Sequence, residues 1–166
     1  YPVLTNKQRH EIGIEYKENS FLAKKVGASI ISLNISKIIN KIKFDKKQKI
    51  LIYCWRGGLR SLSLYLVLKQ IGYDVTLLDG GYKNYRRFVV KFFETSCEKY
   101  KFNQIMGVTG VGKTLFIKEL SKNYQVIDFE GLANHKGSIL GNIPNKNQPS
   151  QKYFENLIYK KLQQNV

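Results

Sequence analysis

The alternation of apolar and polar positions begins with two helical patterns. Thr5, with Gln8 three residues later, fits a capping box and predicts a short helix that runs to about Lys17. Ser20 is a candidate cap for a second helix, in which apolar residues recur near helical spacing. These apolar positions are Leu22, Val26, Ile30, Leu33 and Ile38.

The next pattern alternates short strands with a helix. Residues 50–53 form an apolar run typical of a short buried strand, and residues 74–78 predict the next strand, which ends at Gly80 and Gly81. Between them, residues 61–71 predict a helix whose inward positions are Leu62, Leu66 and Leu68. This succession of strand, loop, helix and strand predicts a parallel βαβ unit, in which ligands bind at the carboxyl ends of the strands.

A second α/β unit follows, with a boundary near residue 100. Residues 82–93 predict a helix, and residues 95–102, which have no clear period, connect it to the rest. The later elements are a strand at 104–106, a helix at 114–122, a strand at 125–129 and a closing helix with Pro149 in its first turn. We therefore expect a first domain at residues 1–95, a linker at 96–103 and the start of a second domain at 104–166.

The first candidate site is a glycine-rich loop between a predicted strand and a predicted helix. Residues 107–114 match the phosphate-binding pattern G-x-x-x-x-G-K-[ST] at every fixed position. In such a loop, backbone N–H groups converge on phosphate oxygens, a lysine reaches the terminal phosphate, and a hydroxyl binds Mg²⁺ where that ion is used. The candidate phosphate-binding residues are Gly107, Thr109, Gly110, Gly112, Lys113 and Thr114.

Two carboxylates follow this loop. Asp128 and Glu130 stand at the end of the predicted strand at 125–129 and are candidates to hold metal-bound water or to act as a base. They are equally consistent with a pair that caps a helix or orders a loop. Both interpretations are open at this point.

The second candidate site is Cys54, within Tyr-Cys-Trp-Arg-Gly-Gly-Leu-Arg-Ser at residues 53–61. Arg56, Arg60, the loop N–H groups and the start of the next helix favour a reactive thiolate. We expect Cys54, Arg56 and Arg60 to form a catalytic site. A buried cysteine that ends a strand and the loop of a cysteine-dependent phosphatase are the alternatives, and Tyr53 stands where those phosphatases usually carry histidine. Cys97 lacks such surroundings and is expected to be inert.

The composition narrows the class of protein. An apolar content of 43% in 166 residues is enough for a globular core. The longest apolar stretches fall short of the roughly 20 residues that a membrane span needs. Two cysteines in different settings argue against a disulfide framework, so we expect a cytoplasmic protein that does not act at a membrane. Neither His10 nor His135 has sequence neighbours that complete a metal site.

The strong positive charge indicates a polyanionic partner. A net charge of +16, from 28 Lys and Arg against 12 Asp and Glu, attracts nucleic acid through counterion release, although a genome that favours lysine gives the same excess. The candidate RNA-contacting residues are Lys83, Tyr85, Arg86, Arg87 and Lys91, with Tyr82 as a further ring. Such rings stack on unpaired bases while cations bind phosphates. Alternatively, the rings are core residues and the charges are merely solvated.

Several motifs in order carry a resemblance to a known family. Residues 54–61 resemble the rhodanese-type loop of the tRNA 2-selenouridine synthases, bacterial enzymes that fuse a rhodanese domain to a P-loop domain. The further matches, in the same order as in the family, are residues 1–5, residues 78–87, the P-loop, residues 128–138 and residues 148–156. The resemblance covers nearly the whole chain.

The resemblance implies an α/β fold, with a rhodanese-like parallel-sheet unit followed by a P-loop NTPase-like α/β unit. Both units are expected to be incomplete, since the family's opening strands and its long C-terminal region have no counterpart here. It also implies a transferase that replaces the sulfur of 2-thiouridine at the tRNA wobble position with selenium, through a geranylated intermediate. The implied substrates are geranyl diphosphate, selenophosphate and the anticodon loop of tRNA, with Cys54 as the nucleophile and the P-loop as the diphosphate site.

Two other functions compete with this one. A P-loop NTPase or kinase fused to a noncatalytic rhodanese domain would bind ATP tightly with Mg²⁺. A basic RNA-binding module without catalysis would carry a Cys54 thiol of ordinary pKa, and loss of Cys54 would change nothing.

Overall fold

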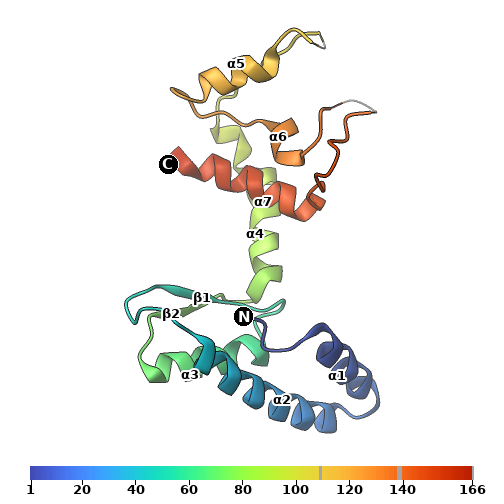
Figure 1. The fold of residues 1–166 in the computed structure, drawn as a ribbon, viewed down its shortest axis with the longest axis vertical. Coiled ribbons are helices and arrows are strands. Elements are labelled where there is room, and N and C mark those ends of the chain that lie inside the picture. The colour runs from blue at the N-terminus through green and yellow to red at the C-terminus, as the bar shows by residue number, and fades with distance from the viewer. Residues whose placement is uncertain (109, 138–139, 166) are drawn as a thin grey trace. The chain divides into compact units, whose positions relative to one another are not determined.

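The computed structural model describes residues 1–108, 110–137 and 140–165 (Figure 1). The architecture is α/β and includes a two-stranded parallel sheet. The chain divides into two compact units, Tyr1–Tyr85 and Arg86–Val166, which are called unit 1 and unit 2 below. The linker at 96–103 and the domain bounds expected from the sequence stay a prediction.

Unit 1 begins with a pair of helices. Helix α1 (Asn6–Glu18) starts after Thr5, and the predicted capping box is confirmed, because the Gln8 N–H donates to Thr5 Oγ1 at 3.2 Å and the Thr5 N–H donates to Gln8 Oε1 at 3.0 Å. Helix α2 (Ser20–Lys41) is capped by Asn19. Ser20 is therefore the first helical residue, and the prediction that it is the cap was wrong by one position.

The buried face of α2 shares only Ile38 with the apolar positions that define the helical pattern in the sequence. It consists of Ala23, Gly27, Ile31, Ile35 and Ile38, whereas Leu22, Val26 and Leu33 are exposed. A Cβ at Gly27 would lie 3.7 Å from Ile12 of α1, so small residues here let the two helices pack closely. Apolar residues lie on more than one side of α2, and contacts with α1 and α3 decide which side is buried.

The predicted βαβ unit is confirmed. Strands β1 (Ile50–Ile52) and β2 (Val75–Leu77) pair in parallel, and helix α3 (Leu59–Ile71) connects them. Helix α3 buries Ser61, Leu64 and Leu68, while Leu62 and Leu66 are exposed, so the inward face was predicted correctly at Leu68 alone. A buried set at i, i+3 and i+7 follows one side of a helix, and the predicted set did not.

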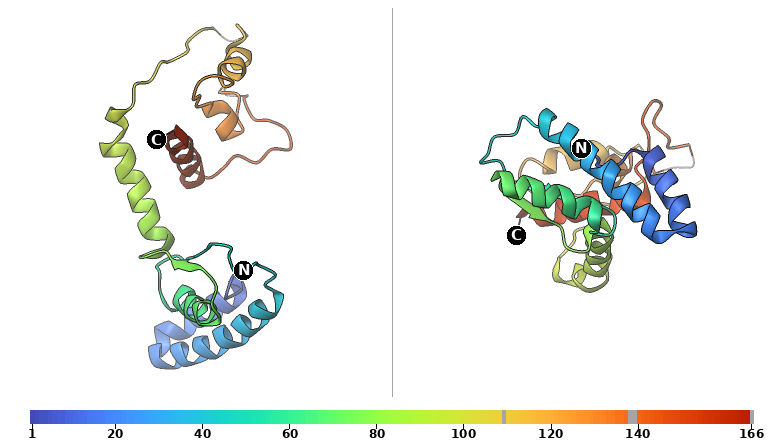
Figure 2. Two further views of the ribbon diagram at one scale, coloured as in Figure 1. Left: turned by 90° about the vertical axis from the view of Figure 1, so that its left-hand side faces the viewer. Right: turned by 90° about the horizontal axis from the view of Figure 1, so that it is seen from below.

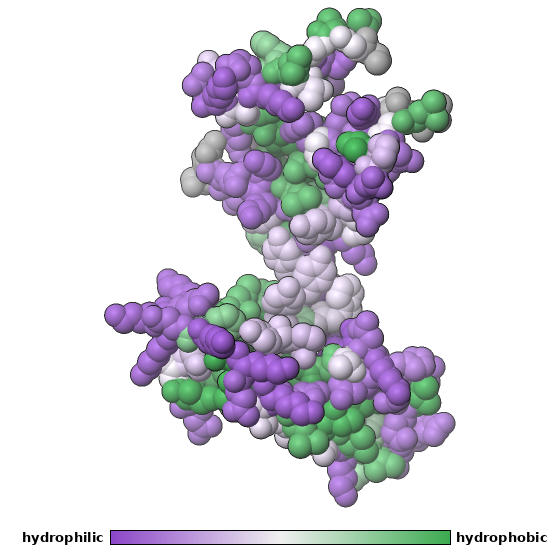
Figure 3. All heavy atoms as spheres, in the orientation of Figure 1, coloured by the Kyte–Doolittle hydropathy of each residue, from purple (hydrophilic) through white to green (hydrophobic). Residues whose placement is uncertain are grey.

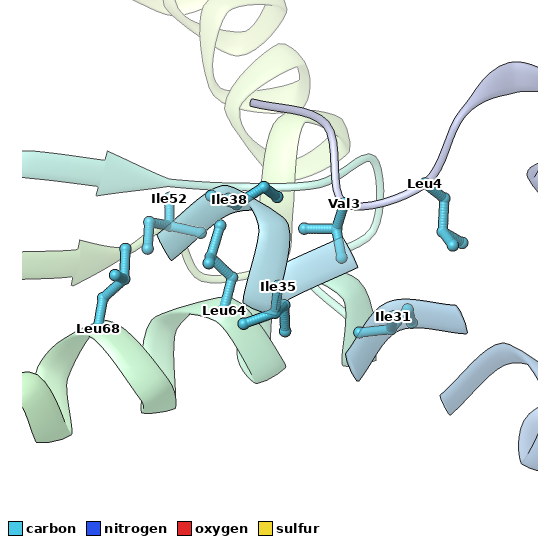
Figure 4. Packing of buried hydrophobic residues seen from close by; sticks show 8 residues of the cluster. All are labelled: Val3, Leu4, Ile31, Ile35, Ile38, Ile52, Leu64 and Leu68. Atoms are coloured by element: carbon cyan, nitrogen blue, oxygen red, sulfur yellow. The ribbon is translucent and has the colours of Figure 1, made fainter. Parts of the chain in front are cut away.

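The core of unit 1 lies between the sheet and the helices. Ile52 of β1 faces Leu64 and Leu68 of α3, and residues of α2 complete the cluster (Figure 4). Its buried members are Val3, Leu4, Ile31, Ile35, Ile38, Ile52, Leu64 and Leu68. Leu51, which alternates with Ile52 along β1, is exposed. Figure 2 shows α1, α2 and α3 in two further views.

Unit 2 is helical over its described residues. Helix α4 (Gly81–Thr95) enters it from unit 1, and the elements that follow are η1 (Cys97–Lys99), α5 (Lys113–Leu120), α6 (Phe129–Ala133), α7 (Gln151–Leu162) and η2 (Gln163–Asn165). The strands predicted at 104–106 and 125–129 are absent from the structure, and Phe129 begins α6 instead. A strand needs a hydrogen-bonded neighbour, and the described residues give these segments none.

Helix α7 packs against the second half of α4. Ser150 caps α7, so Pro149 lies just before the cap rather than in the first turn as predicted. The Tyr159 ring makes edge contacts with Phe92 at 4.9 Å and with Phe88 at 5.7 Å between ring centroids. Aromatic contacts of this geometry stabilise the packing of the two helices within unit 2.

Candidate functional site

The Cys54 loop leaves the carboxyl end of β1 and curls around the sulfur. The Gly58 N–H donates to Cys54 Sγ at 3.2 Å, and the Ser61 hydroxyl lies 3.2 Å from the same atom. Ser61 is only 2% exposed and lies in the first turn of α3. Gly57 has a φ of +68°, which glycine adopts readily. The site is therefore built by one short loop and the start of one helix.

These hydrogen bonds set the acidity of the thiol. Burial raises the pKa of Cys54, but the hydrogen bond from the Ser61 side chain and those from backbone N–H groups outweigh it. The donating N–H groups belong to Arg56, Gly58 and Ser61. The pKa of Cys54 consequently lies below its ordinary value, which favours the nucleophilic thiolate.

The two arginines of the predicted catalytic set occupy different positions. Arg56 acts on the thiol through its backbone N–H, and its side chain is exposed. Arg60 lies in the first turn of α3 and is half-buried. A catalytic role for either guanidinium stays a prediction. Ser61 was missed as a site residue, because in the sequence it appeared only as the start of a helix.

A glycine turn locks the Cys54 loop from the other side. Gly80 and Gly81 have φ values of +64° and +62°. A Cβ on Gly81 would overlap the Cys54 carbonyl oxygen and the Gly57 nitrogen, and a Cβ on Gly57 would lie 2.8 Å from the Gly81 nitrogen. The two backbones therefore touch directly, and only glycine fits at either point of contact.

The first turn of α4 completes this lock. The Tyr82 N–H donates to the Cys54 carbonyl at 2.9 Å, and the Lys83 N–H donates to the Trp55 carbonyl at 2.9 Å. The N-terminal N–H groups of a helix have no partner inside the helix, so here they hold the loop that carries the thiol. The loop after β1 and the turn after β2 thus form one backbone assembly at the carboxyl edge of the sheet.

Aromatic rings surround the cysteine in the chain. The Tyr82 ring lies 6.3 Å from Tyr53, 5.7 Å from Trp55 and 6.0 Å from Tyr85 between centroids. Tyr53 is 56% exposed and Trp55 is 45% exposed, whereas Tyr82 and Tyr85 are half-buried. These four residues are called the aromatic cluster below, and they all belong to unit 1.

The predicted RNA-contacting cations differ in their surroundings. Lys83, Arg87 and Lys91 are exposed, while the Arg86 side chain is 11% exposed and forms an ion pair with Glu155. Arg86 also donates to Asn156 Oδ1 at 2.6 Å, and its hydrogen bond lowers the pKa of the Glu155 carboxyl. The Arg86 guanidinium is thus engaged inside unit 2, where it connects α4 to α7.

The P-loop lies before α5 in unit 2. Gly110 and Gly112 have φ values of +84° and +90°, so the backbone takes the left-handed turns that the motif requires. Lys113 folds back over the loop, and its Nζ donates to the Gly107 carbonyl at 2.6 Å and the Val108 carbonyl at 2.8 Å. Thr114 is exposed in the first turn of α5. Thr109 lies outside the described residues.

The two carboxylates after the P-loop lie at a helix start. Asp128 caps α6, because its Oδ1 accepts from the Gly131 N–H at 2.9 Å. Glu130 lies in the first turn of the same helix. This geometry supports the capping interpretation for Asp128, and a metal or base role for the pair stays a prediction. Among the residues with described positions, no three His, Cys, Asp or Glu side chains gather into a metal site.

Over the described residues, no helix combines the length and the apolar character that crossing a membrane requires. Apolar residues are visible at the surface of each unit in Figure 3. The Cys97 backbone belongs to η1, and its side chain lies outside the described positions.

Comparison with known proteins gives two consecutive domain matches. Residues 22–87 match the rhodanese-like domain, and residues 100–166 match the tRNA 2-selenouridine synthase AAA domain. The first range contains the Cys54 loop, and the second contains the P-loop. A solved N-terminal domain from Clostridium difficile 630 is 34% identical and has a TM-score of 0.47, covering 54% of this chain and 72% of that one.

Curated relatives carry one shared name. The tRNA 2-selenouridine synthase of Nitrosomonas europaea is 35% identical over 163 aligned residues, which cover 93% of this chain and 41% of that protein. The tRNA 2-selenouridine synthase of Shewanella halifaxensis is 34% identical over 164 aligned residues, covering 95% of this chain and 43% of that protein. The chain thus spans less than half the length of these relatives. It belongs to the tRNA 2-selenouridine synthase family.

Proposed function

We propose that the protein containing this chain is a cytoplasmic transferase that modifies tRNA, replacing the sulfur of 2-thiouridine at the wobble position with selenium. The observation that carries the proposal is the Cys54 loop, which holds a thiol of lowered pKa in a chain whose relatives are named for this modification. The positive charge of the chain, +16, supports a polyanionic substrate such as tRNA.

The proposed chemistry passes through a geranylated intermediate. The sulfur of 2-thiouridine attacks the first carbon of geranyl diphosphate, so that a carbon–sulfur bond forms, a carbon–oxygen bond breaks and diphosphate leaves. The resulting thioether is easier to displace than the original thiocarbonyl sulfur. Selenium from selenophosphate then bonds to the carbon of the base that carries the thioether sulfur, and geranyl thiolate leaves that carbon. Water cleaves the selenium–phosphorus bond and releases phosphate.

Unit 2 offers the phosphate site for this reaction. Gly110 and Gly112 shape a loop whose N–H groups suit a diphosphate, and Lys113 already lies across that loop. The exposed Thr114 hydroxyl is the side chain that would bind Mg²⁺ if that ion accompanies the diphosphate. We propose this use of the loop for binding a leaving group, without ATP hydrolysis.

Unit 1 offers a reactive thiolate. Cys54 has a thiol stabilised as thiolate by a hydroxyl and by backbone N–H groups, which do not titrate and therefore act at any pH. We assign to this thiolate the handling of the sulfur-bearing or selenium-bearing group during exchange. The loop position is fixed by its hydrogen bonds to the first turn of α4.

Mass analysis of nucleosides from total tRNA tests the proposal. A strain that lacks the full-length gene is expected to lose 2-selenouridine, and the parent gene should restore it. The Cys54→Ser variant, which is nearly isosteric but a much weaker nucleophile, should not restore it. A deletion strain with unchanged 2-selenouridine would contradict the proposed function.

A further inference from the structure

We propose that Tyr53 and Trp55 form a stacking platform for an unpaired base of RNA beside Cys54, with Tyr82 as the ring that supports both. The inference rests on the proposed function and assigns the part of the site that holds the base during exchange. It moves the stacking role from Tyr82 and Tyr85, which the sequence suggested, to the two residues on either side of the cysteine.

Tyr82 supports the rings of both Tyr53 and Trp55. Tyr82 contacts Tyr53 with an interplanar angle of 30° and Trp55 with an angle of 41°. Tyr82 is half-buried, and its backbone N–H is bonded to the Cys54 carbonyl. The supporting ring is therefore fixed to the same backbone assembly that fixes the thiol.

Exposure separates the platform from core aromatic residues. Members of the unit 1 core are 2% to 9% exposed, whereas Tyr53 is 56% exposed and Trp55 is 45% exposed. Each ring thus keeps a large surface in contact with water after packing against Tyr82. A flat base can cover such a surface, since every base has an aromatic face that stacks on a ring.

The positive charges near the platform favour nucleic acid as its ligand. Arg56, directly after Trp55, is exposed, and so is Lys83, whose N–H donates to the Trp55 carbonyl at 2.9 Å. Arg60 follows within the first turn of α3. Exposed rings among cations match a single-stranded chain, in which bases stack on the rings and phosphates meet the charges. An apolar ligand would gain nothing from these cations.

The position of the platform relates it to the chemistry. Tyr53 and Trp55 are the chain neighbours of Cys54, so both rings belong to the loop that carries the thiol. Tyr82, at the start of α4, contacts both rings. The platform therefore lies on the same loop as the cysteine and not on a remote part of unit 1.

The test measures binding of two probes to the full-length protein. One probe is the octamer of uridylate, and the other is an abasic octamer with the same phosphates and no bases. The parent should bind the uridylate octamer about tenfold more tightly, and Trp55→Ala should remove that preference while leaving abasic binding unchanged. Trp55→Phe should retain most of the preference, because a ring remains.

Fluorescence locates the contact. Trp55 is the only tryptophan of this chain, so quenching by the uridylate octamer that is present in the parent and lost in Trp55→Phe reports on this ring. The matched control is Tyr16→Ala, which removes an exposed ring on α1 and should leave both affinities unchanged. The alkylation rate of Cys54 should stay the same in Trp55→Ala, which shows that the loop is intact.

Two outcomes would overturn the inference. Equal affinity of the parent for both probes would mean that bases make no contact. Quenching of Trp55 by geraniol but not by the uridylate octamer would make the rings an apolar site. Either result leaves the proposed function standing, because loss of 2-selenouridine in the deletion strain is measured independently.

Discussion

The Cys54 loop and the P-loop are both glycine-rich loops with a candidate chemical role, but the structure supports them in different ways. In unit 1, the Cys54 loop is held by the parallel strand pair, by Ser61 of α3 and by the first turn of α4. In unit 2, the described part of the P-loop is shaped by its own glycines and by Lys113. One site is built by tertiary packing, and the other by local sequence.

Burial shows the same difference. Unit 1 has a cluster of eight buried apolar residues, while Met106 and Val108, before and within the P-loop, are 79% and 77% exposed. A P-loop normally follows a buried strand, but the described residues 104–106, directly before this loop, form none. The described part of the phosphate loop is thus held by contacts within the loop, whereas the thiol loop is held by contacts with α3 and α4 at the edge of a sheet.

The largest expected effect concerns the core of unit 1. Leu68→Ala should lower the free energy of unfolding by about 2 to 5 kcal/mol, because Leu68 is 2% exposed and its removal leaves a cavity. Leu66→Ala, on the exposed side of the same helix, should cost less than about 1 kcal/mol. Urea unfolding monitored by circular dichroism measures both. Equal losses would mean that the buried side of α3 is not the one described.

The next effect breaks the lock between the Cys54 loop and α4. Gly81→Ala should destabilise unit 1 by about 1 to 3 kcal/mol and abolish the enhanced reactivity of Cys54, because Gly81 has a positive φ and its Cβ would overlap the loop backbone. Gly58→Ala is the matched control. Gly58 has a φ of −90°, and a Cβ there meets nothing within 4 Å.

The alkylation rate of Cys54, measured against pH, compares the Gly81→Ala and Gly58→Ala variants. The Gly58→Ala variant keeps the N–H that donates to Cys54 and should retain a low inflection point. An unchanged inflection in a folded Gly81→Ala variant would show that the lock does not position the thiol.

A third change addresses the independence of the two loops. Lys113→Ala should weaken the binding of geranyl diphosphate by roughly ten- to a hundredfold, since it removes a charge-assisted contact of about 1.5 to 3 kcal/mol. Cys54 reactivity should not change, because the two loops belong to separate units. Titration calorimetry measures the affinity, with Lys118→Ala on the same helix as the control. Unchanged affinity would place the diphosphate elsewhere.

The features that the sequence predicted correctly depend on residues close together in the chain. The Thr5 capping box depends on residues three apart, and the βαβ unit depends on two apolar runs around an amphipathic segment. The Cys54 loop could be recognised because its glycines and the cysteine lie within five residues. All of these features are contained in a single stretch of chain.

The features that the sequence did not predict depend on contacts between residues far apart in the chain. Helix α2 buries Gly27 because Ile12 of another helix packs there. Arg86 is held by Glu155, which lies 69 residues away, and no local pattern predicts that pair. The contact of Gly81 with Gly57 likewise needs the fold, although paired glycines after two neighbouring strands were a usable signal. The strands expected in unit 2 failed because an apolar run forms a strand only beside a partner.

The smallest expected effect isolates one hydrogen bond at the thiol. Ser61→Ala removes the hydroxyl that donates to Cys54 Sγ and should raise the pKa of Cys54, because a hydrogen bond to the charged form favours the thiolate. Backbone N–H groups still favour the thiolate, so the shift should be partial. Alkylation against pH measures the shift, with Ser63→Ala as the control, because the Ser63 hydroxyl donates to the Leu59 carbonyl and not to Cys54.

The hydrogen bond from Ser61 to Cys54 also affects how the stability of unit 1 depends on pH. The folded pKa of Cys54 is lowered, so its contribution to the stability of unit 1 is fully present above the unfolded pKa of about 8.5 and is lost as pH falls through the folded pKa. Ser61→Ala should therefore reduce the gain in stability between neutral and alkaline pH. An identical pH dependence in parent and variant would show that backbone N–H groups alone hold the thiolate.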